Sequence, residues 1–148
     1  MSDLTIVRAT VEDVDVLHPL VEAYRDFYKQ APSDKTQQYL SDRLANNELI
    51  GWIASIDGVA VGFTIVYPTF STVSLSEIWL LNDLFVKPEA RGHKIASQLM
   101  QTVEDAARAA GATRTFLRTA NDNIPAQALY EGRGWVQDTV FRRYDLIF

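Results

Sequence analysis

Residues 87–96 read Lys-Pro-Glu-Ala-Arg-Gly-His-Lys-Ile-Ala, and this stretch determines how the rest of the chain is interpreted. The apolar run 84–86 precedes it and predicts the end of a strand. Apolar residues at helical spacing follow it, at Ile95, Leu99, Val103, Ala106 and Ala110. A loop between a strand and a helix start presents free backbone N–H groups where the helix dipole favours negative charge. Cations surround this loop at Lys87, Arg91, His93 and Lys94. The sequence therefore predicts an anion site suited to phosphate.

The composition indicates one globular domain, spanning residues 1–148. The chain has 148 residues and is 47% hydrophobic, and no apolar run approaches the roughly 20 residues that span a bilayer. Its first residues lack the charged start and apolar core of a signal peptide, so we expect a cytoplasmic protein with no membrane partner.

Residue usage excludes several kinds of chemistry. The absence of cysteine excludes disulfides, a thiolate nucleophile and an acyl-cysteine intermediate. The only histidines, His18 and His93, lie far apart in sequence, so no metal site is predicted. A net charge of −5 argues against nucleic-acid binding, which needs a broad basic surface.

Periodicity predicts an α/β fold with the element order β-α-α-β-β-β-α-β-α-β. The expected strands are 4–8, 50–56, 59–67, 75–86, 114–119 and 135–148, the last as one strand or a pair. Thr10 and Asp13 resemble a capping box before a helix that reaches residue 28, and a weaker helix covers 33–47. Residues 57–58 predict a hairpin turn and residues 68–73 another. A helix before the fifth strand makes that strand parallel to the fourth, which predicts one mixed sheet with helices on both faces.

Two motifs in these elements resemble the GNAT superfamily of N-acetyltransferases. Leu84-Phe85-Val86-x-Pro88-x-x-Arg91-Gly92-x-x-x-Ala96 is similar to the acetyl-coenzyme A binding motif, commonly Arg/Gln-x-x-Gly-x-Gly/Ala. Asn123-x-x-Ala126-x-x-Leu129-Tyr130-Glu131-x-x-Gly134-Trp135 is similar to the later motif, which usually ends in Gly-Phe. The element order is also that of the GNAT fold. Lys94 is a departure, because the family usually has a glycine there.

The resemblance implies acetyl-CoA as cofactor. Its diphosphate would lie on the N–H groups of Arg91, Gly92, His93, Lys94, Ile95 and Ala96. Its pantetheine arm would lie along the backbone of Leu84, Phe85 and Val86, with contacts from Asn123, Ala126 and Tyr130. Unpaired backbone groups between two separating strands can bind an amide-rich arm. Asn123 is also a helix cap, which alone explains its residue type.

The reaction would be direct attack of an amine on the thioester, which needs a base, because an alkyl ammonium has a pKa near 10.4. The candidate bases are Glu77 and Asp83, although either can be purely structural. Asn82 stands where several GNAT enzymes have a glutamate, and it can only orient substrate or water. Tyr130 occupies the place of a tyrosine that protonates the departing thiolate in this superfamily.

The acceptor is expected to be a small cationic primary amine, such as a polyamine or an amino acid. Aromatic and acidic side chains attract such amines. The candidates for the acceptor site are Tyr24, Phe27, Tyr28, Trp79 and Asn82, with Trp52, Tyr67, Glu22 and Asp26 as further aromatic and acidic residues. Two alternatives stay open: a protein lysine or N-terminal acetyltransferase, and a non-catalytic acyl-CoA binding module. By analogy with the superfamily, the chain could form a homodimer in which the C-terminal strand pairs or swaps.

Overall fold

A five-stranded sheet organises the fold of this chain, for which a computed structural model describes residues 3–148. The strands are β1 (Leu4–Arg8), β2 (Ile50–Ile56), β3 (Val59–Ser71), β4 (Ser76–Val86) and β5 (Thr115–Phe116). They lie side by side in chain order, and among the strand pairs of residues 3–148 only the β4–β5 pair is parallel. The hairpin turn at Asp57-Gly58 has positive φ at both residues, as a type I′ hairpin turn requires. The predicted mixed sheet is confirmed.

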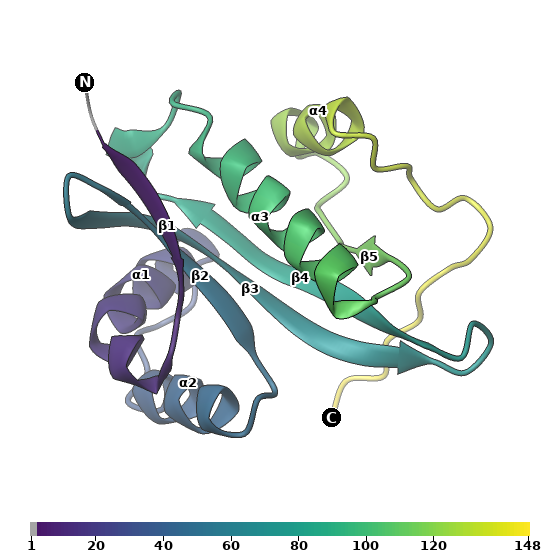
Figure 1. Cartoon of the computed structure of the whole chain (residues 1–148), viewed down its shortest axis with the longest axis horizontal. Helices are drawn as coiled ribbons and strands as arrows, with labels where there is room; N and C mark the ends of the chain where they lie inside the picture. Colours follow the sequence, from purple (N-terminus) through teal and green to yellow (C-terminus); the bar gives the residue numbers. More distant parts are fainter. Residues whose placement is uncertain (1–2) are drawn as a thin grey trace. The chain divides into compact units, whose positions relative to one another are not determined.

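Helices cover both faces of the sheet, as the sequence predicts. The helices α1 (Val14–Phe27) and α2 (Thr36–Ala45) lie on one face, and α3 (Ile95–Ala110) lies on the other (Figure 1). Two short 3-10 helices, η1 (Val11–Asp13) and η2 (Pro88–Ala90), precede α1 and α3. The capping box of Thr10 and Asp13 forms, and Gly111 ends α3 in the left-handed conformation. No helix within residues 3–148 is long and apolar enough to cross a membrane.

Strand alternation sends apolar side chains into two cores. Under α1 and α2, a buried cluster includes Leu17, Leu20, Leu40, Phe63, Ile65 and Phe85. The register of β2, β3 and β4 places Trp52, Thr64 and Leu84 on the opposite face of the sheet. The apolar side of α3, with Leu99 and Val103 fully buried, lies over that face.

The third strand is longer than its sequence predicts, and the expected turn at 68–73 is wrong. β3 continues through Pro68 to Ser71, and the turn lies at residues 72–75. The β2 ladder ends at the Ile50–Val66 pair, so Pro68 has only β4 as a strand neighbour. A proline, which lacks an N–H group, is tolerated in such a position at the sheet edge.

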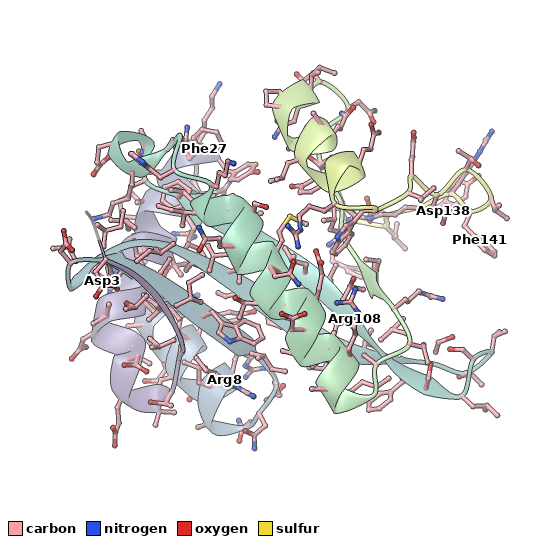
Figure 2. All side chains as sticks on the ribbon, turned by 45° about the horizontal axis from the view of Figure 1, so that its top comes forward. Asp3, Arg8, Phe27, Arg108, Asp138 and Phe141 are labelled. Atoms are coloured by element: carbon pink, nitrogen blue, oxygen red, sulfur yellow. The ribbon has the colours of Figure 1, made fainter. Side chains whose placement is uncertain are left out.

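The internal contacts of the chain define two compact units, one reaching Arg118 and one comprising Thr119–Phe148. The second unit contains α4 (Ile124–Gly132), where the Asn123 side chain accepts a hydrogen bond from the N–H of Ala126, as a cap should. The expected strand at 135–148 is wrong: residues 135–148 form no strand (Figure 2). Instead, Asp138 Oδ1 accepts local hydrogen bonds from the N–H groups of Val140 and Phe141, which compete with strand pairing.

Candidate active site

A cavity of about 340 Å³ lies between the first two helices and the middle of the sheet. Side chains from α1, α2, β3 and β4 line it, all within the first unit. Tyr24, Asn82 and Asp83, three predicted site residues, meet there, together with Tyr67. This volume is at the small end of ligand pockets, so the cavity suits a small molecule.

A register shift in β4 creates one polar corner of the cavity. Ile65 pairs with Asp83 and Val66 pairs with Leu81, which leaves Asn82 as an extra residue in β4. The bulge lets Asn82 and Asp83 line the same cavity although they are adjacent in the strand. Asn82 Nδ2 donates a hydrogen bond of 3.0 Å to Asp83 Oδ2. The fully buried Thr64 hydroxyl donates a 2.8 Å hydrogen bond to the Asp83 carbonyl oxygen, which holds this residue in place.

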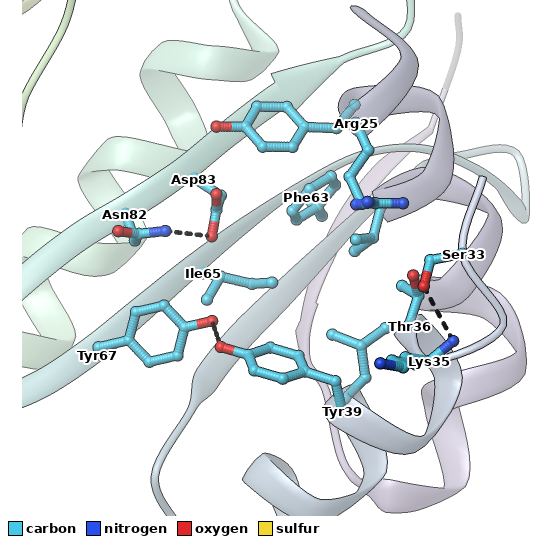
Figure 3. A pocket seen from close by; sticks show the side chains of 13 residues that line it. Arg25, Ser33, Lys35, Thr36, Tyr39, Phe63, Ile65, Tyr67, Asn82 and Asp83 are labelled. Carbon is cyan, nitrogen blue, oxygen red and sulfur yellow. Dashed lines mark hydrogen bonds between the residues drawn. The ribbon is translucent and has the colours of Figure 1, made fainter. Parts of the chain in front are cut away.

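Asp83 is a carboxylate with altered acidity. Burial raises its pKa above the ordinary aspartate value, and hydrogen bonds from Asn82 and Tyr24 oppose that rise only in part. Burial, and then the negative charge of Asp83, raise the pKa of Tyr24, so Tyr24 keeps its proton at neutral pH. Burial likewise raises the pKa of Tyr67, followed by the hydrogen bond of 2.6 Å that its hydroxyl shares with the Tyr39 hydroxyl (Figure 3). A carboxylate with a raised pKa is a stronger base than an ordinary aspartate, which suits proton transfer from a bound group.

The other predicted acceptor-site residues lie outside this cavity. Phe27 and Tyr28 are exposed at the end of α1, where their rings pack edge to face. Trp79 is buried beside Trp52 on the opposite face of the sheet, and no residue in the described chain, 3–148, accepts from its indole N–H. Glu77 lies two residues before Trp79 in β4 and therefore shares that opposite face, apart from Asp83.

The cationic loop before α3 has the geometry of an anion site. Residues 91–94 are exposed, and within residues 3–148 no protein atom accepts from the backbone N–H groups of residues 92–96. Arg91 Nε donates to the Val86 carbonyl oxygen at 3.0 Å, and its guanidinium stacks over the Phe27 ring at 5.6 Å. Lys94, in the position where the similar family usually has glycine, adopts the left-handed conformation with φ 60°.

The edge of β4 near this loop is open. The β4–β5 ladder pairs Trp79 with Thr115 and Leu80 with Phe116, and within residues 3–148 it goes no further, whereas β4 continues to Val86. Because β5 is shorter than the predicted 114–119, no second strand within residues 3–148 pairs with residues 81–86, and their backbone groups that β3 and Arg91 do not bind can meet an amide-rich ligand. The Phe85 side chain itself lies in the core under α1, so only its backbone can take part.

The later motif lies in the second unit. Tyr130 is half-buried on α4, with its ring 6.4 Å from that of Trp135, and Asn123 and Ala126 form the helix start. Their roles toward a cofactor remain predictions.

Sequence reasoning missed the residues that α2 and its preceding loop bring to the cavity. These are Ser33, Lys35, Thr36, Tyr39 and Leu40, with Arg25 from α1 and Phe63 and Ile65 from β3. One signal could have pointed to them: a lysine stands at the start of a predicted helix, where an acidic or capping residue is preferred.

Known proteins resemble this chain along nearly its full length. The model of the acetyltransferase (GNAT) family matches residues 17–135. The uncharacterized N-acetyltransferase YhfO of Bacillus subtilis (strain 168) is 40% identical over 144 residues, 97% of each chain. The aminoalkylphosphonate N-acetyltransferase of Salmonella typhimurium is 30% identical over 141 residues, 87% of this chain and 82% of that protein. A solved structure of a probable acetyltransferase has a TM-score of 0.92 and 37% identity, with 97% of both chains covered.

Proposed function

Since this chain belongs to the GNAT family of acetyltransferases, we propose that it acetylates the primary amine of a small molecule that lies in the Asp83 cavity. When bound, acetyl-CoA supplies an acetyl thioester that an uncharged amine can attack directly. The observation that carries the proposal is a partly buried carboxylate, with a raised pKa, in a cavity that borders the open edge of β4. The Salmonella relative, named for aminoalkylphosphonates, supports a small amine as the acceptor.

Asp83 is the proposed base. An alkyl ammonium with a pKa near 10.4 is only about one part in a thousand neutral at pH 7, so the bound amine must lose a proton. The Asp83 carboxylate first attracts the ammonium and then accepts its proton, directly or through a water. The raised pKa makes this carboxylate a stronger base than an ordinary aspartate. Glu77 is the less favoured candidate, because it does not line the cavity.

The open loop and the open strand edge fit the cofactor. The free N–H groups of residues 92–96 and the charge of Lys94 would bind the diphosphate, and the backbone of residues 84–86 would bind the pantetheine arm. Asn123 and Ala126 would contact that arm. The Tyr130 hydroxyl would donate a proton to the departing sulfur, a modest contribution of about a hundredfold in rate.

Release of free thiol from acetyl-CoA in the presence of small primary amines tests the proposal. We expect turnover by the natural chain, a loss of about a hundredfold or more in Asp83→Asn, and a similar loss in Tyr130→Phe, with thermal protection by acetyl-CoA retained in both variants. Asp26→Asn is the matched control, because it removes an exposed carboxylate from α1 outside the cavity.

Three other outcomes would contradict parts of the proposal. If Glu77→Gln loses turnover and Asp83→Asn does not, Asp83 is not the base. Thiol release with peptides alone would make the chain a protein acetyltransferase. Saturable acetyl-CoA binding without thiol release for any amine or peptide would make it a non-catalytic acyl-CoA binding module.

A further inference from the structure

The Asp83 cavity has opposite charges at its two sides. Figure 3 shows Asn82 and Asp83 on β4 at one side and Arg25 and Lys35 on the helix side, with Phe63 and Ile65 between them. We call Arg25 and Lys35 the cationic side. Of the residues that line the cavity, two are therefore cations and one is a carboxylate. A ligand that fills this cavity meets a carboxylate, an apolar floor and then positive charge.

Lys35 supplies charge that folding does not explain. Within residues 3–148 its ammonium has no ion-pair or hydrogen-bond partner, and Lys35 is exposed to solvent. It is also the N-cap residue of α2, where its own side chain makes no capping hydrogen bond and where the helix dipole disfavours a cation. A positive charge at this place therefore makes α2 less stable, and an anion in the cavity would reverse that effect.

Arg25 is held in position rather than free. Its Nη1 donates to the Ala31 carbonyl oxygen at 2.9 Å and pairs with Glu22 Oε1 at 3.4 Å. Glu22 also accepts a hydrogen bond from the Thr36 hydroxyl, which, ahead of the charge of Arg25, lowers the pKa of Glu22 and keeps it ionised. Glu22 thus offsets much of the charge of Arg25, and Lys35 carries the net positive charge of the cationic side.

Resting on the proposed function, we infer that the acceptor is an amine with an anionic group, whose ammonium lies at Asp83 and whose anion lies at Lys35 and Arg25. The buried side chains of Phe63 and Ile65 lie between these charges and accommodate a short apolar spacer. Carboxylate and phosphonate share the required chemistry, so amino acids and aminoalkylphosphonates both qualify. A polyamine does not, because its second ammonium would meet like charge at Lys35.

A panel of amines that differ only in the far group tests the inference. The panel is 3-aminopropanoate, 2-aminoethylphosphonate, propylamine and 1,3-diaminopropane, and kcat/KM is measured from thiol release. We expect at least one anionic amine to exceed propylamine by about tenfold or more, and the diamine to fall below propylamine. Comparison of kcat/KM between 3-aminopropanoate and 2-aminoethylphosphonate shows whether a carboxylate or a phosphonate is preferred.

Substitution of Lys35 should change this order of preference. Lys35→Met should reduce kcat/KM for the anionic amines about tenfold more than it changes kcat/KM for propylamine, and Lys35→Glu should favour the diamine over both anionic amines. Lys29→Glu is the matched control, because Lys29 is an exposed lysine outside the cavity and should leave the preference intact. Circular dichroism checks that each variant is folded.

The inference and the proposed function fail in different ways. If propylamine is acetylated as well as its anionic analogues, or if Lys35→Glu keeps the anionic preference, the inference is wrong and the proposed function stands. If no amine releases thiol, the proposed function is wrong. In that case thermal protection by the same four amines is the second readout, and equal protection by all four would overturn the inference as well.

Discussion

Asp83, the proposed base, also lowers the stability of the fold. Burial raises its pKa, so the folded chain binds a proton at Asp83 more tightly than the unfolded chain does. The free energy of unfolding therefore falls as pH rises from the ordinary value of 3.8 through the raised pKa, and it stays lower above that pKa. At neutral pH, the ionised Asp83 makes the fold less stable.

Asp83→Asn should consequently have opposite effects on stability and turnover. At pH 7 the variant should unfold at a higher urea concentration than the natural chain, because it removes a partly buried charge, and it should lose turnover, because an amide is not a base. Below pH 3.8 the gain in stability should vanish. Urea titrations of both chains at several pH values measure this difference in the free energy of unfolding. Lower stability of the variant at pH 7 would show that the carboxylate is a net stabilising group instead.

Lys94 carries backbone strain in the loop before α3. Its φ of 60° is the left-handed conformation, which costs a residue with a Cβ roughly 1 kcal/mol relative to glycine. We expect the free energy of unfolding, measured by urea titration, to be about 1 kcal/mol higher for Lys94→Gly than for Lys94→Ala. Both variants lose the same charge, and only alanine keeps the strain. Equal stability of the two variants would exclude this strain. Isothermal titration should show weaker acetyl-CoA binding in both, if the Lys94 charge meets the diphosphate.

Among the elements, β4 is the one whose irregularity creates the site. The extra residue Asn82 turns the Asp83 side chain into the cavity, while residues further along the strand keep their alternation. Thr64 on β3 holds the bulge through the Asp83 carbonyl oxygen at 2.8 Å, and it is the only polar side chain in the described chain with no exposed area. A buried threonine therefore helps to hold the proposed base in position.

Thr64→Val should test that support, because valine has a similar shape but cannot donate a hydrogen bond. The lost bond should lower the free energy of unfolding by about 1–2 kcal/mol. It should also reduce kcat more than acetyl-CoA affinity. Thr64→Ser keeps the hydroxyl and should retain most of the turnover, although it loses a methyl group from the core. If Val and Ser variants have the same kcat, the hydroxyl does not position Asp83.

Local signals in the sequence predict most elements of this fold. The capping box at Thr10 and the turn at Asp57-Gly58 depend on neighbouring residues only, and both are confirmed. The continuation of β3 through Pro68 depends on where the β2 ladder stops, which is a property of pairing between distant residues. Local patterns cannot report such pairing.

The site is less accessible to sequence reasoning than the fold. Asp83 and Tyr24 are recognisable by residue type, but the bulge at Asn82 and the arrival of Lys35 at the same cavity result from packing between α2 and β4. Glu77 and Asp83 could not be separated by sequence, because the bulge decides which face of the strand each one occupies.

At the scale of the whole molecule, the C-terminal segment is unusual in its exposed apolar side chains. They are Val136, Val140, Phe141, Tyr144, Leu146, Ile147 and Phe148, and each is at least 79% exposed. Apolar residues in such number at a surface mark an interaction site. We therefore expect this segment to be covered by a second copy of the chain in a homodimer.

Light scattering after gel filtration measures the oligomeric state. The natural chain should have twice its mass of 16.7 kDa, and the double variant Phe141→Glu, Leu146→Glu should be monomeric. Arg142→Gln is the control, because it changes a polar neighbour in the same segment and should remain dimeric. A natural chain that is monomeric at micromolar concentration would contradict the expectation.

The stacking of Arg91 on Phe27 joins two regions that lie far apart in sequence. Phe27 ends the helix whose preceding turns bring Tyr24 and Arg25 to the Asp83 cavity, and Arg91 begins the loop proposed to bind the diphosphate. Tyr24 on the same helix also contacts Phe85 of β4, with ring centroids 5.8 Å apart, so a shift of this helix would be transmitted to the strand and loop that follow. The two substrates should accordingly not bind independently: the dissociation constant of one should change when the other is present, and by the same factor in the reverse direction.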